Sequence, residues 1–383
     1  MNYMIEQIHS LPELLKQIAQ PLDETIRHKL DNELCSSLQR IYTVGCGDSH
    51  HAALATEFLF ESLTNLPTEP MNSMQLSRYA AGFIPQSGSK TNLVIGISVS
   101  GAVSRTAEAM LMAAQTGATT AALTATPESP LGKAVEIILD VPVPEFSTPP
   151  NLVIPGVRSY LTSMLGLMFT AIHIAQVRGS IEDAHAKQLR GSIADFSGLI
   201  EQTIAQCEPL VKQAVEACKD AREFVFLGSG PNYGTALFTA AKLLEASGDA
   251  AIGQDIEEWA HLQYFAREVT TPTFIITTAD RDLSRAEEIA VAANTIGRRV
   301  FAIAPSSAAD LIKNAAHHFP IPPVQEMFSP ILTAIPGELF AAYRAEVLQE
   351  PFFRNFAGGR NIEGGGGISR IRTSETWENW RKP

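Results

Sequence analysis

The sequence is poor in charge, and what charge it has is mostly acidic. Only 18% of its 383 residues are charged, and acidic side chains outnumber basic ones to give a formal net charge of -12. A chain this acidic is not expected to bind nucleic acid, because the phosphates repel it. An anionic ligand would have to be captured by a local site.

Cysteines and long apolar runs are also scarce. The four cysteines show no CxxC spacing or cluster typical of a metal site, and a chain of this length does not need disulfides, so we expect a cytoplasmic protein. Residues 161–177 form the most apolar stretch, but polar residues interrupt it, which favours a buried core helix over a membrane span. Residues 1–20 lack the basic end and apolar block of a signal peptide.

The second half of the chain repeats the first. Residues 41–49 read IYTVGCGDS and correspond to residues 224–232, which read FVFLGSGPN. Further on, residues 92–98 align with 272–278, and Gly117 aligns with Gly297. Two copies of ordinary domain size follow from this repeat.

Each copy alternates short apolar runs with helical stretches, which is typical of parallel strands joined by crossover helices. The predicted strands are residues 41–45, 68–72, 91–97, 119–124 and 136–141, then 223–227, 250–254, 272–278, 299–304 and 317–320. Helices are predicted for residues 49–63, 74–81, 103–116 and 129–134 of the first copy, for the region 157–221, and for residues 329–348.

The clearest candidate binding loop is Ser98-Val99-Ser100-Gly101, between a strand and a helix. A helix start offers unpaired N–H groups and the positive end of the helix dipole, and glycine lets an anion approach the backbone. Ser49 stands at the matching place after the first strand, and Ser104 lies in the first turn of the second helix. These serines predict a phosphate site, although serines at such positions also serve as ordinary N-caps. The second copy has Asp280 and Asp282 there, which would repel a phosphate.

Gly-x-Gly follows the first strand of both copies, which raises the alternative of a dinucleotide site. The first copy lacks the third glycine of that motif, and the second has Gly234 one residue late. Tight strand-to-helix turns explain these glycines better.

Several motifs, in their order along the chain, resemble those of the sugar isomerase (SIS) family: Gly45-Cys46-Gly47-Asp48-Ser49, Ser98-Val99-Ser100-Gly101, Gly156-Val157-Arg158-Ser159 and Ala241-Lys242-Leu243-Leu244-Glu245. The family's two-copy members include the isomerase half of glucosamine-6-phosphate synthase and the phosphosugar deglycases. The resemblance covers residues 35–350. It implies an α/β fold of two tandem flavodoxin-like domains, each a five-stranded parallel sheet flanked by helices.

The resemblance also implies domain boundaries and site residues. The expected parts are a helical segment at 1–34, a phosphate-binding domain at 35–178, a helical connector at 179–221, a catalytic domain at 222–350 and a tail over the active site at 351–383. The implied substrate-binding residues are Gly47, Ser49, Ser98, Val99, Ser100, Ser104, Val157 and Ser159, and the implied catalytic residues are Glu245, His261 and Lys242.

The residue types fit that chemistry. Interconverting an aldose and a ketose requires a group that moves a proton between neighbouring carbons, and a carboxylate partly withdrawn from water suits this task. Glu245 ends an apolar helix face, where the first copy has only Ser62. Lys242, one turn earlier, could hold the carboxylate ionised, and His261 could open the sugar ring.

Plainer interpretations stay open for these residues. Glu245 can be a solvated partner of Lys242, and His261 can bond to Glu257 or Glu258. The two glutamates and His261 also have the spacing of metal ligands on a helix, but no further His or Cys joins them, so we expect no metal and no other cofactor.

The sequence thus predicts a cofactor-independent phosphosugar isomerase or deglycase that acts on a sugar or aminosugar (fructosamine-type) 6-phosphate through an enediol or enolamine. The alternatives are a phosphosugar-binding regulatory protein without catalysis, against which Glu245 and His261 count, and a dinucleotide-dependent oxidoreductase. The resemblance implies a homodimer with shared active sites, in which His261 serves the partner's pocket. It also makes Arg360, Arg370 and Arg372 candidates for the family's tail lysine, and we expect no use of glutamine, because the synthase's glutaminase domain has no counterpart here.

Overall fold

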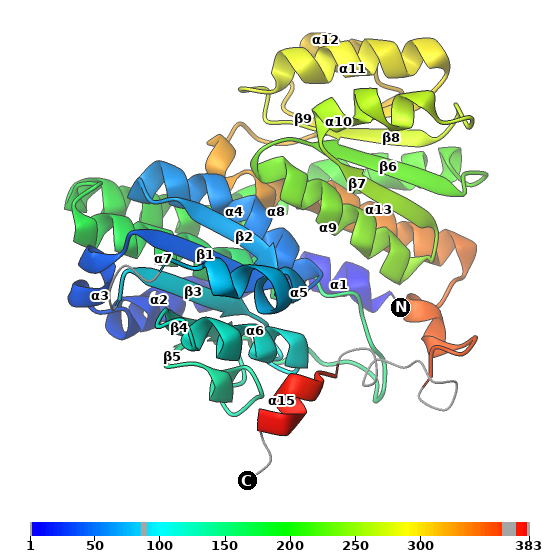
Figure 1. Cartoon of the computed structure of the whole chain (residues 1–383). Helices are drawn as coiled ribbons and strands as arrows, with labels where there is room; N and C mark the ends of the chain where they lie inside the picture. Colours follow the sequence, from blue (N-terminus) through cyan, green and yellow to red (C-terminus); the bar gives the residue numbers. More distant parts are fainter. Residues whose placement is uncertain (1, 86–89, 362–372, 381–383) are drawn as a thin grey trace. The chain divides into compact units, whose positions relative to one another are not determined.

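The computed structural model describes residues 2–85, 90–361 and 373–380 (Figure 1). The chain forms two compact units. The first-sheet unit consists of the described residues of Leu14–Glu145, Ser159–Asp195 and Phe356–Pro383. The second-sheet unit consists of those of Met1–Glu13, Phe146–Arg158 and Phe196–Asn355.

Each unit contains one parallel five-stranded sheet, and the two sheets have the same topology. The first has the order β2-β1-β3-β4-β5 and the second the order β7-β6-β8-β9-β10. The predicted α/β fold is confirmed, and the strands lie close to their predicted positions: β1 Arg40–Gly45, β2 Thr68–Asn72, β3 Asn92–Ile97, β4 Thr119–Thr124, β5 Ile137–Asp140, β6 Glu223–Gly228, β7 Ala250–Gln254, β8 Pro272–Ile276, β9 Arg299–Ala304 and β10 His317–Pro320.

Helices connect and cover the strands. Those of the first-sheet unit are α2 Leu11–Lys29, α3 Asn32–Ser37, α4 Asp48–Thr64, α5 Ser73–Gln75, α6 Ser104–Ala114, α7 Arg158–Arg178 and α15 Glu375–Trp380. Helix α8, Asp183–Ala217, runs from this unit into the second-sheet unit, which also contains α1 Tyr3–His9, α9 Pro231–Ala246, α10 Ile256–His261, α11 Leu283–Ile296, α12 Ala309–Lys313 and α13 Pro330–Leu348.

The structure differs from the prediction in three short segments. The helix predicted at 74–81 is a succession of tight turns, with α5 followed by a π-helix at Leu76–Ala80 and a 3₁₀ turn at Ala81–Phe83. The helix predicted at 129–134 is only the 3₁₀ turn Gly132–Ala134. The tail, in which no helix was predicted, contains α15.

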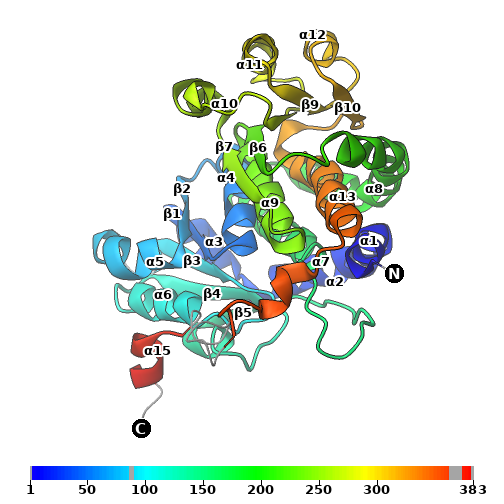
Figure 2. The same ribbon diagram turned by 90° about the vertical axis from the view of Figure 1, so that its right-hand side faces the viewer.

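The first-sheet unit has three layers, with helices packed on both faces of its sheet. Side chains along each strand point alternately to the two faces, so both faces are covered. Tyr42, Val44 and Val94 pack with Met110 of α6 in one core cluster. On the opposite face α7 packs so closely that a Cβ at Gly166 would lie 2.6 Å from Leu123. Right-handed crossovers in opposite directions from β1 and β3 place α4 and α6 on opposite faces, as Figure 2 shows.

Helix α7 contains the apolar stretch identified in the sequence. It is long and apolar enough to cross a membrane by length and composition, and 89% of its most apolar window is buried inside the protein. The expectation of a buried core helix is therefore confirmed.

The second-sheet unit has a layer of phenylalanine rings on one face of its sheet. Phe274 stacks on Phe226 and Phe301 at centroid separations of 4.5 and 4.7 Å, and Phe340 of α13 meets Phe274 edge-on at 4.9 Å. On the other face, Val225, Leu227 and neighbouring aliphatic residues pack against α10 and α11. Aromatic pairs of this geometry add to the stabilisation from burial alone.

The strand pairing corrects the alignment of the two copies by one residue. Val44 pairs with Gly96 in the first sheet, and the corresponding Leu227 pairs with Ile275 in the second. Gly96 therefore corresponds to Ile275, so Ser98 corresponds to Thr277 and not to Thr278. The second copy has one extra residue between β8 and α11. An alignment anchored on Gly117 and Gly297 ignores this residue and so shifts β8 by one position.

Candidate active site

The turn between β1 and α4 brings a helix start close to the end of a strand. The turn leaves little room for a side chain at Gly45, because a Cβ there would lie 2.6 Å from the Cβ of Ser49. Gly47 has φ 54° and ψ −127°, a conformation that favours glycine, and no side chain in the described residues caps the first turn of α4. Its N–H groups and the half-buried Ser49 hydroxyl are the donors that a small anion requires.

The loop between β3 and α6 is fixed from both sides. The N–H of Ser98 donates to the carbonyl of Leu123 at 3.1 Å, and the carbonyl of Val99 accepts from the N–H of Ala125 at 2.9 Å. A Cβ on Gly101, whose φ is +60°, would lie 1.9 Å from the Ser129 hydroxyl, so this position requires glycine. Ser98 is buried, Ser100 is exposed, and Val99 and Ser104 are half-buried.

The two loops share one edge of the first sheet because β1 and β3 are paired parallel neighbours. Both lead into helices whose first turns lack a side-chain cap in the described part of the chain. The structure thus gathers Gly47, Ser49 and the segment Ser98–Ser104 at the carboxyl ends of adjacent strands, where doubly wound sheets bind their ligands.

The corresponding edge of the second sheet is acidic. Burial raises the pKa of Asp282, and the negative charges of Asp280 and Asp255 raise it further. Burial also raises the pKa of Glu326, again with contributions from Asp280 and Asp282. Four carboxyl groups thus lie at this edge, of which the sequence had pointed to only two, and Arg281 pairs with Glu326 at 3.2 Å. An anion would be repelled here, so the two edges have opposite chemistry.

Lys242 and Glu245 form an ion pair in the last turns of α9. The Lys242 side chain is fully buried, with its ammonium 5.2 Å from the centre of the Phe238 ring, whereas the Glu245 side chain is 29% exposed. Glu245 is thus a carboxylate partly withdrawn from water and paired with a buried cation.

His261, the last residue of α10, lies at the surface. Its side chain is 66% exposed, and Nε2 donates to Glu257 at 3.1 Å. Hydrogen bonds from Arg285 and from His261 lower the pKa of Glu257. The bond to Glu257 is one of the plainer alternatives that the sequence left open, but the exposure excludes a packing role for the imidazole.

Val157 and Ser159 flank Arg158, the first residue of α7, where the chain passes from the second-sheet unit to the first-sheet unit. Val157 is buried and Ser159 is half-buried, at the start of α7. The adjacent Arg158 donates to the Ser10 hydroxyl at 2.8 Å, and burial lowers the pKa of its guanidinium. In the tail, Arg360 is exposed, whereas Arg370 and Arg372 lie outside the described residues.

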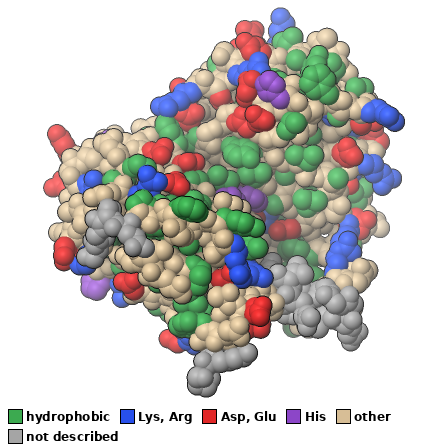
Figure 3. Space-filling model, viewed as in Figure 1, with side chains coloured by type: hydrophobic (Ala, Val, Ile, Leu, Met, Phe, Trp, Pro, Cys, Tyr) green, Lys and Arg blue, Asp and Glu red, His purple; other side chains and the backbone are tan. Residues whose placement is uncertain are grey.

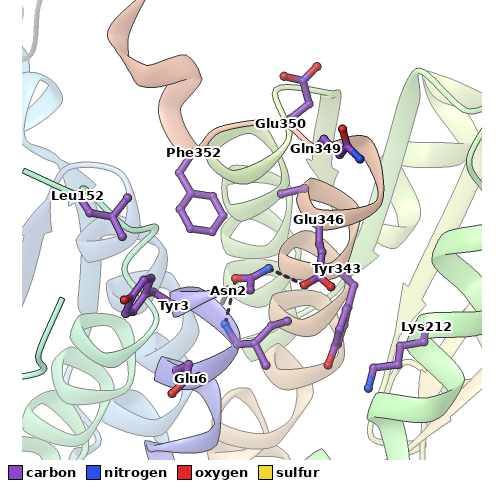
Figure 4. A pocket seen from close by; sticks show the side chains of 12 residues that line it. Asn2, Tyr3, Glu6, Leu152, Lys212, Tyr343, Glu346, Gln349, Glu350 and Phe352 are labelled. Carbon is purple, nitrogen blue, oxygen red and sulfur yellow. Dashed lines mark hydrogen bonds between the residues drawn. The ribbon is translucent and has the colours of Figure 1, made fainter. Parts of the chain in front are cut away.

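Two further features bear on ligand binding. Over the described ranges of the chain, no group of three or more His, Cys, Asp or Glu side chains is arranged to hold a metal ion. The second-sheet unit has a cavity of about 770 Å³ (Figure 4), and none of the predicted site residues lines it. Its walls are formed by Asn2, Tyr3, Ile5, Glu6, Leu152, Lys212, Tyr343, Ala345, Glu346, Gln349, Glu350 and Phe352.

Charge is dispersed on the face of the molecule that Figure 3 shows. Acidic and basic side chains are interspersed there, and no broad basic surface is visible on that face. This face therefore offers no broad basic surface to attract a phosphate, and local hydrogen bonds would have to bind it.

Comparison with known proteins agrees with the fold. Residues 34–173 match the SIS domain family. Over 352 residues the chain is 28% identical to glutamine–fructose-6-phosphate aminotransferase (isomerizing) of Gloeobacter violaceus, covering 90% of this chain and 56% of that protein. The enzyme of the same name from Thermococcus kodakarensis is 27% identical over 348 residues, covering 90% and 55%. The chain spans about half the length of the curated relatives it matches.

Two solved structures have the same fold. The C-terminal domain of glucosamine-fructose-6-phosphate aminotransferase from Francisella tularensis superposes with a TM-score of 0.78 at 18% identity, covering 90% of this chain and 96% of that one. Glucosamine-6-phosphate deaminase from Thermotoga maritima gives 0.64 at 19% identity, covering 92% and 96%. The chain therefore contains a region, residues 34–173, that matches the SIS domain. Its tandem arrangement resembles that C-terminal domain in particular.

Proposed function

We propose that this protein is a phosphosugar isomerase or deglycase that binds the phosphate with the loops after β1 and β3 and moves a proton with Glu245. The relatives' names include fructose 6-phosphate and glucosamine 6-phosphate, and a sugar or aminosugar 6-phosphate is the substrate class we assign. The observation that carries the proposal is the contrast between the two sheet edges: the helix starts lack a side-chain cap at both, but one edge is lined with serine hydroxyls and the other with four carboxyl groups.

The proton-transfer step assigns a role to the ion pair in α9. In the substrate a carbonyl, which in a fructosamine is the C2 ketone, makes the neighbouring C–H acidic; for a fructosamine the proton transfer gives an imine, and water hydrolyses its C=N bond to release the amine. The Glu245 carboxylate takes that proton to give an enediol or enolamine and returns it to the adjacent carbon. The buried Lys242 ammonium, paired with Glu245, favours the ionised carboxylate that accepts the proton at the start of the cycle. His261 is assigned the proton exchange at the sugar oxygens.

Replacing Glu245 with Gln tests the catalytic assignment. The Glu245→Gln variant should bind the phosphosugar that raises the melting temperature of the wild-type protein most, in a screen of hexose, hexosamine and fructosamine 6-phosphates, and should not convert it. Unchanged turnover would remove Glu245 from the mechanism.

A dimer with shared sites is part of the proposal. The exposed His261 is followed by Leu262 and Phe265, whose side chains are 54% and 75% exposed, and such an apolar surface is typical of an interface. Mixing inactive Ser98→Asp and His261→Ala subunits should restore activity if each pocket takes its histidine from the partner. Absence of recovery in a mixture shown to exchange subunits would exclude sharing.

The second candidate is a phosphosugar-binding regulatory protein, which would use the same loops without catalysis. Only the phosphate loops are required for it. A wild-type protein that binds the phosphosugar and leaves it unchanged, even after prolonged incubation, would favour this function over the enzyme. The cytoplasmic location remains a prediction.

A further inference from the structure

Glu108, in the second turn of α6, is a buried carboxylate with three partners. Its side chain is 1% exposed; it forms an ion pair with Arg78 at 2.6 Å and accepts a hydrogen bond from Arg105 at 2.8 Å. The third partner is the hydroxyl of Ser374, which is more than 260 residues away in the sequence. Burial on its own would raise the pKa of Glu108, but the Ser374 hydroxyl and the two guanidinium groups hold it below its ordinary value.

Ser374 belongs to a segment that covers α6. It caps α15, since its hydroxyl accepts from the N–H of Trp377 at 3.2 Å. Trp377 is 3% exposed and lies in the same core cluster as Met110 of α6. Thr376 accepts a hydrogen bond from Arg78 at 3.3 Å. Figures 1 and 2 both show α15 beside α6.

The repeat supplies an internal comparison. The second copy has the same ion pair on α11, Arg285 with Glu288, also at 2.8 Å and also three residues apart. There the Glu288 side chain is 65% exposed. The arginine is about one-third exposed in both copies, at 35% and 36%, so only the carboxylate differs: it is buried in the copy whose helix begins at the serine loop, where Ser374 from the carboxyl end of the chain contacts it.

We propose that Ser374 and Trp377 are positioning residues that hold the first turns of α6, and with them the loop Ser98–Ser104, in the geometry that binds phosphate. The proposal rests on the proposed function. We name α15 together with Ser374 the clasp.

The geometry indicates how the clasp acts. Arg105 is the second residue of α6, and its guanidinium is held by Glu108 one turn further along. A buried carboxylate must have its lone pairs satisfied, so removing the Ser374 hydroxyl leaves Glu108 short of one charge-assisted hydrogen bond. Water then enters beside Glu108, and the turn that contains Ser104 and Arg105 loses its anchor. The buried bond at 3.0 Å between the hydroxyls of Ser73 and Thr106 remains as the other support of this turn.

Hydrogen–deuterium exchange without ligand tests the anchoring directly. Ser374→Ala and Trp377→Ala should speed amide exchange in residues 99–107 roughly 10-fold or more, the effect of one lost charge-assisted hydrogen bond. Peptides from the start of α11 should exchange as in the wild type. Glu288→Gln in the second copy and Glu378→Gln on the exposed side of α15 are the matched controls and should leave residues 99–107 unchanged. Unchanged exchange in the clasp variants would overturn the proposal.

Calorimetric titration with fructose 6-phosphate, at a temperature where every variant is folded, tests the link to binding. The clasp variants should bind roughly 10-fold more weakly than the wild type, and the two controls should bind equally well. A Trp377→Phe variant should recover most of the affinity, because it refills the cluster. Lower stability with unchanged affinity would show a purely structural role and refute the positioning claim. If the wild type binds no phosphosugar, both the proposed function and the positioning claim are wrong. Faster exchange in residues 99–107 of the clasp variants would still show that the clasp anchors this segment.

Discussion

Adding one methyl group at Gly45 should disturb the phosphate loop, and the same change at Gly228 should not. The two glycines occupy equivalent positions at the ends of β1 and β6. A Cβ at Gly45 would lie 2.6 Å from the Cβ of Ser49 and 2.8 Å from its carbonyl carbon. A Cβ at Gly228 would lie 2.2 Å from the carbonyl oxygen of Asn232. The Ala variants therefore push equivalent helix starts away from their strands.

The magnitude follows from these distances. Ordinary van der Waals contact begins at 3.4 Å, so the first turn of α4 must move by about 0.8 Å in Gly45→Ala. Because one of the contacted atoms belongs to the backbone, no side-chain rotation relieves it, and we expect a loss of about 2 kcal/mol in the free energy of unfolding. Gly228→Ala should lose at least as much. Gly191→Ala in α8, where a Cβ meets nothing within 4 Å, should instead gain about 0.5–1 kcal/mol.

Urea unfolding followed by circular dichroism measures the three stabilities, and calorimetric titration with fructose 6-phosphate measures binding. Gly45→Ala should bind roughly 10-fold more weakly, since the displaced Ser49 loses a hydrogen bond to the phosphate. Gly228→Ala should keep the wild-type affinity despite its lower stability. Equal loss of affinity in both variants would refute the reasoning, because phosphate binding would then not depend on the first copy alone.

Two further predictions concern stability. Burial, with the nearby charges of Glu61 and Glu69, raises the pKa of the half-buried Glu57 from 4.5 to about 6, so the folded state binds the extra proton and loses stability as the pH rises through 6. Glu57→Gln should therefore raise the free energy of unfolding by about 1 kcal/mol at pH 7 and leave it unchanged at pH 4. The gain is half of what the pKa shift alone gives, because solvent screens this group. Urea unfolding at the two pH values measures both. Phe274→Ala should cost about 3–5 kcal/mol because it empties the centre of the ring layer. Phe83→Ala, whose side chain is 85% exposed, should change the urea midpoint little, and equal effects would contradict the assignment of the core.

Local sequence patterns were sufficient to predict the strands. Runs such as residues 92–97 are apolar and are buried along their whole length, because helices cover both faces of a parallel sheet. The geometry of the turns could not be predicted as well from the sequence. The segment at 74–81 contains helix-forming residues, but its π-helix and 3₁₀ turns pack against α6, with Ser73 bonded to Thr106. Tertiary contacts of this kind override local propensity.

The sequence predicted which residues could form the site, but it did not predict how deeply they are buried or what they contact. The spacing of Lys242 and Glu245 predicts an i,i+3 pair, and the structure contains it, but the complete burial of the lysine depends on how α9 packs. The clasp had no local signal, because Ser374 and Trp377 acquire their roles through contacts with α6, far away in the chain. The one-residue error in the repeat arose because a loop insertion leaves no trace in the apolar pattern.

The assignment of proton transfer to Glu245 is tested most directly by solvent isotope exchange. The phosphosugar that binds best is incubated in D₂O with the wild-type protein or with Glu245→Gln, and proton NMR follows the hydrogens on the carbons beside the carbonyl. We predict that the wild-type protein exchanges one of these hydrogens for deuterium, whereas Glu245→Gln binds the sugar and leaves every hydrogen in place. Exchange at the wild-type rate by Glu245→Gln would contradict the account.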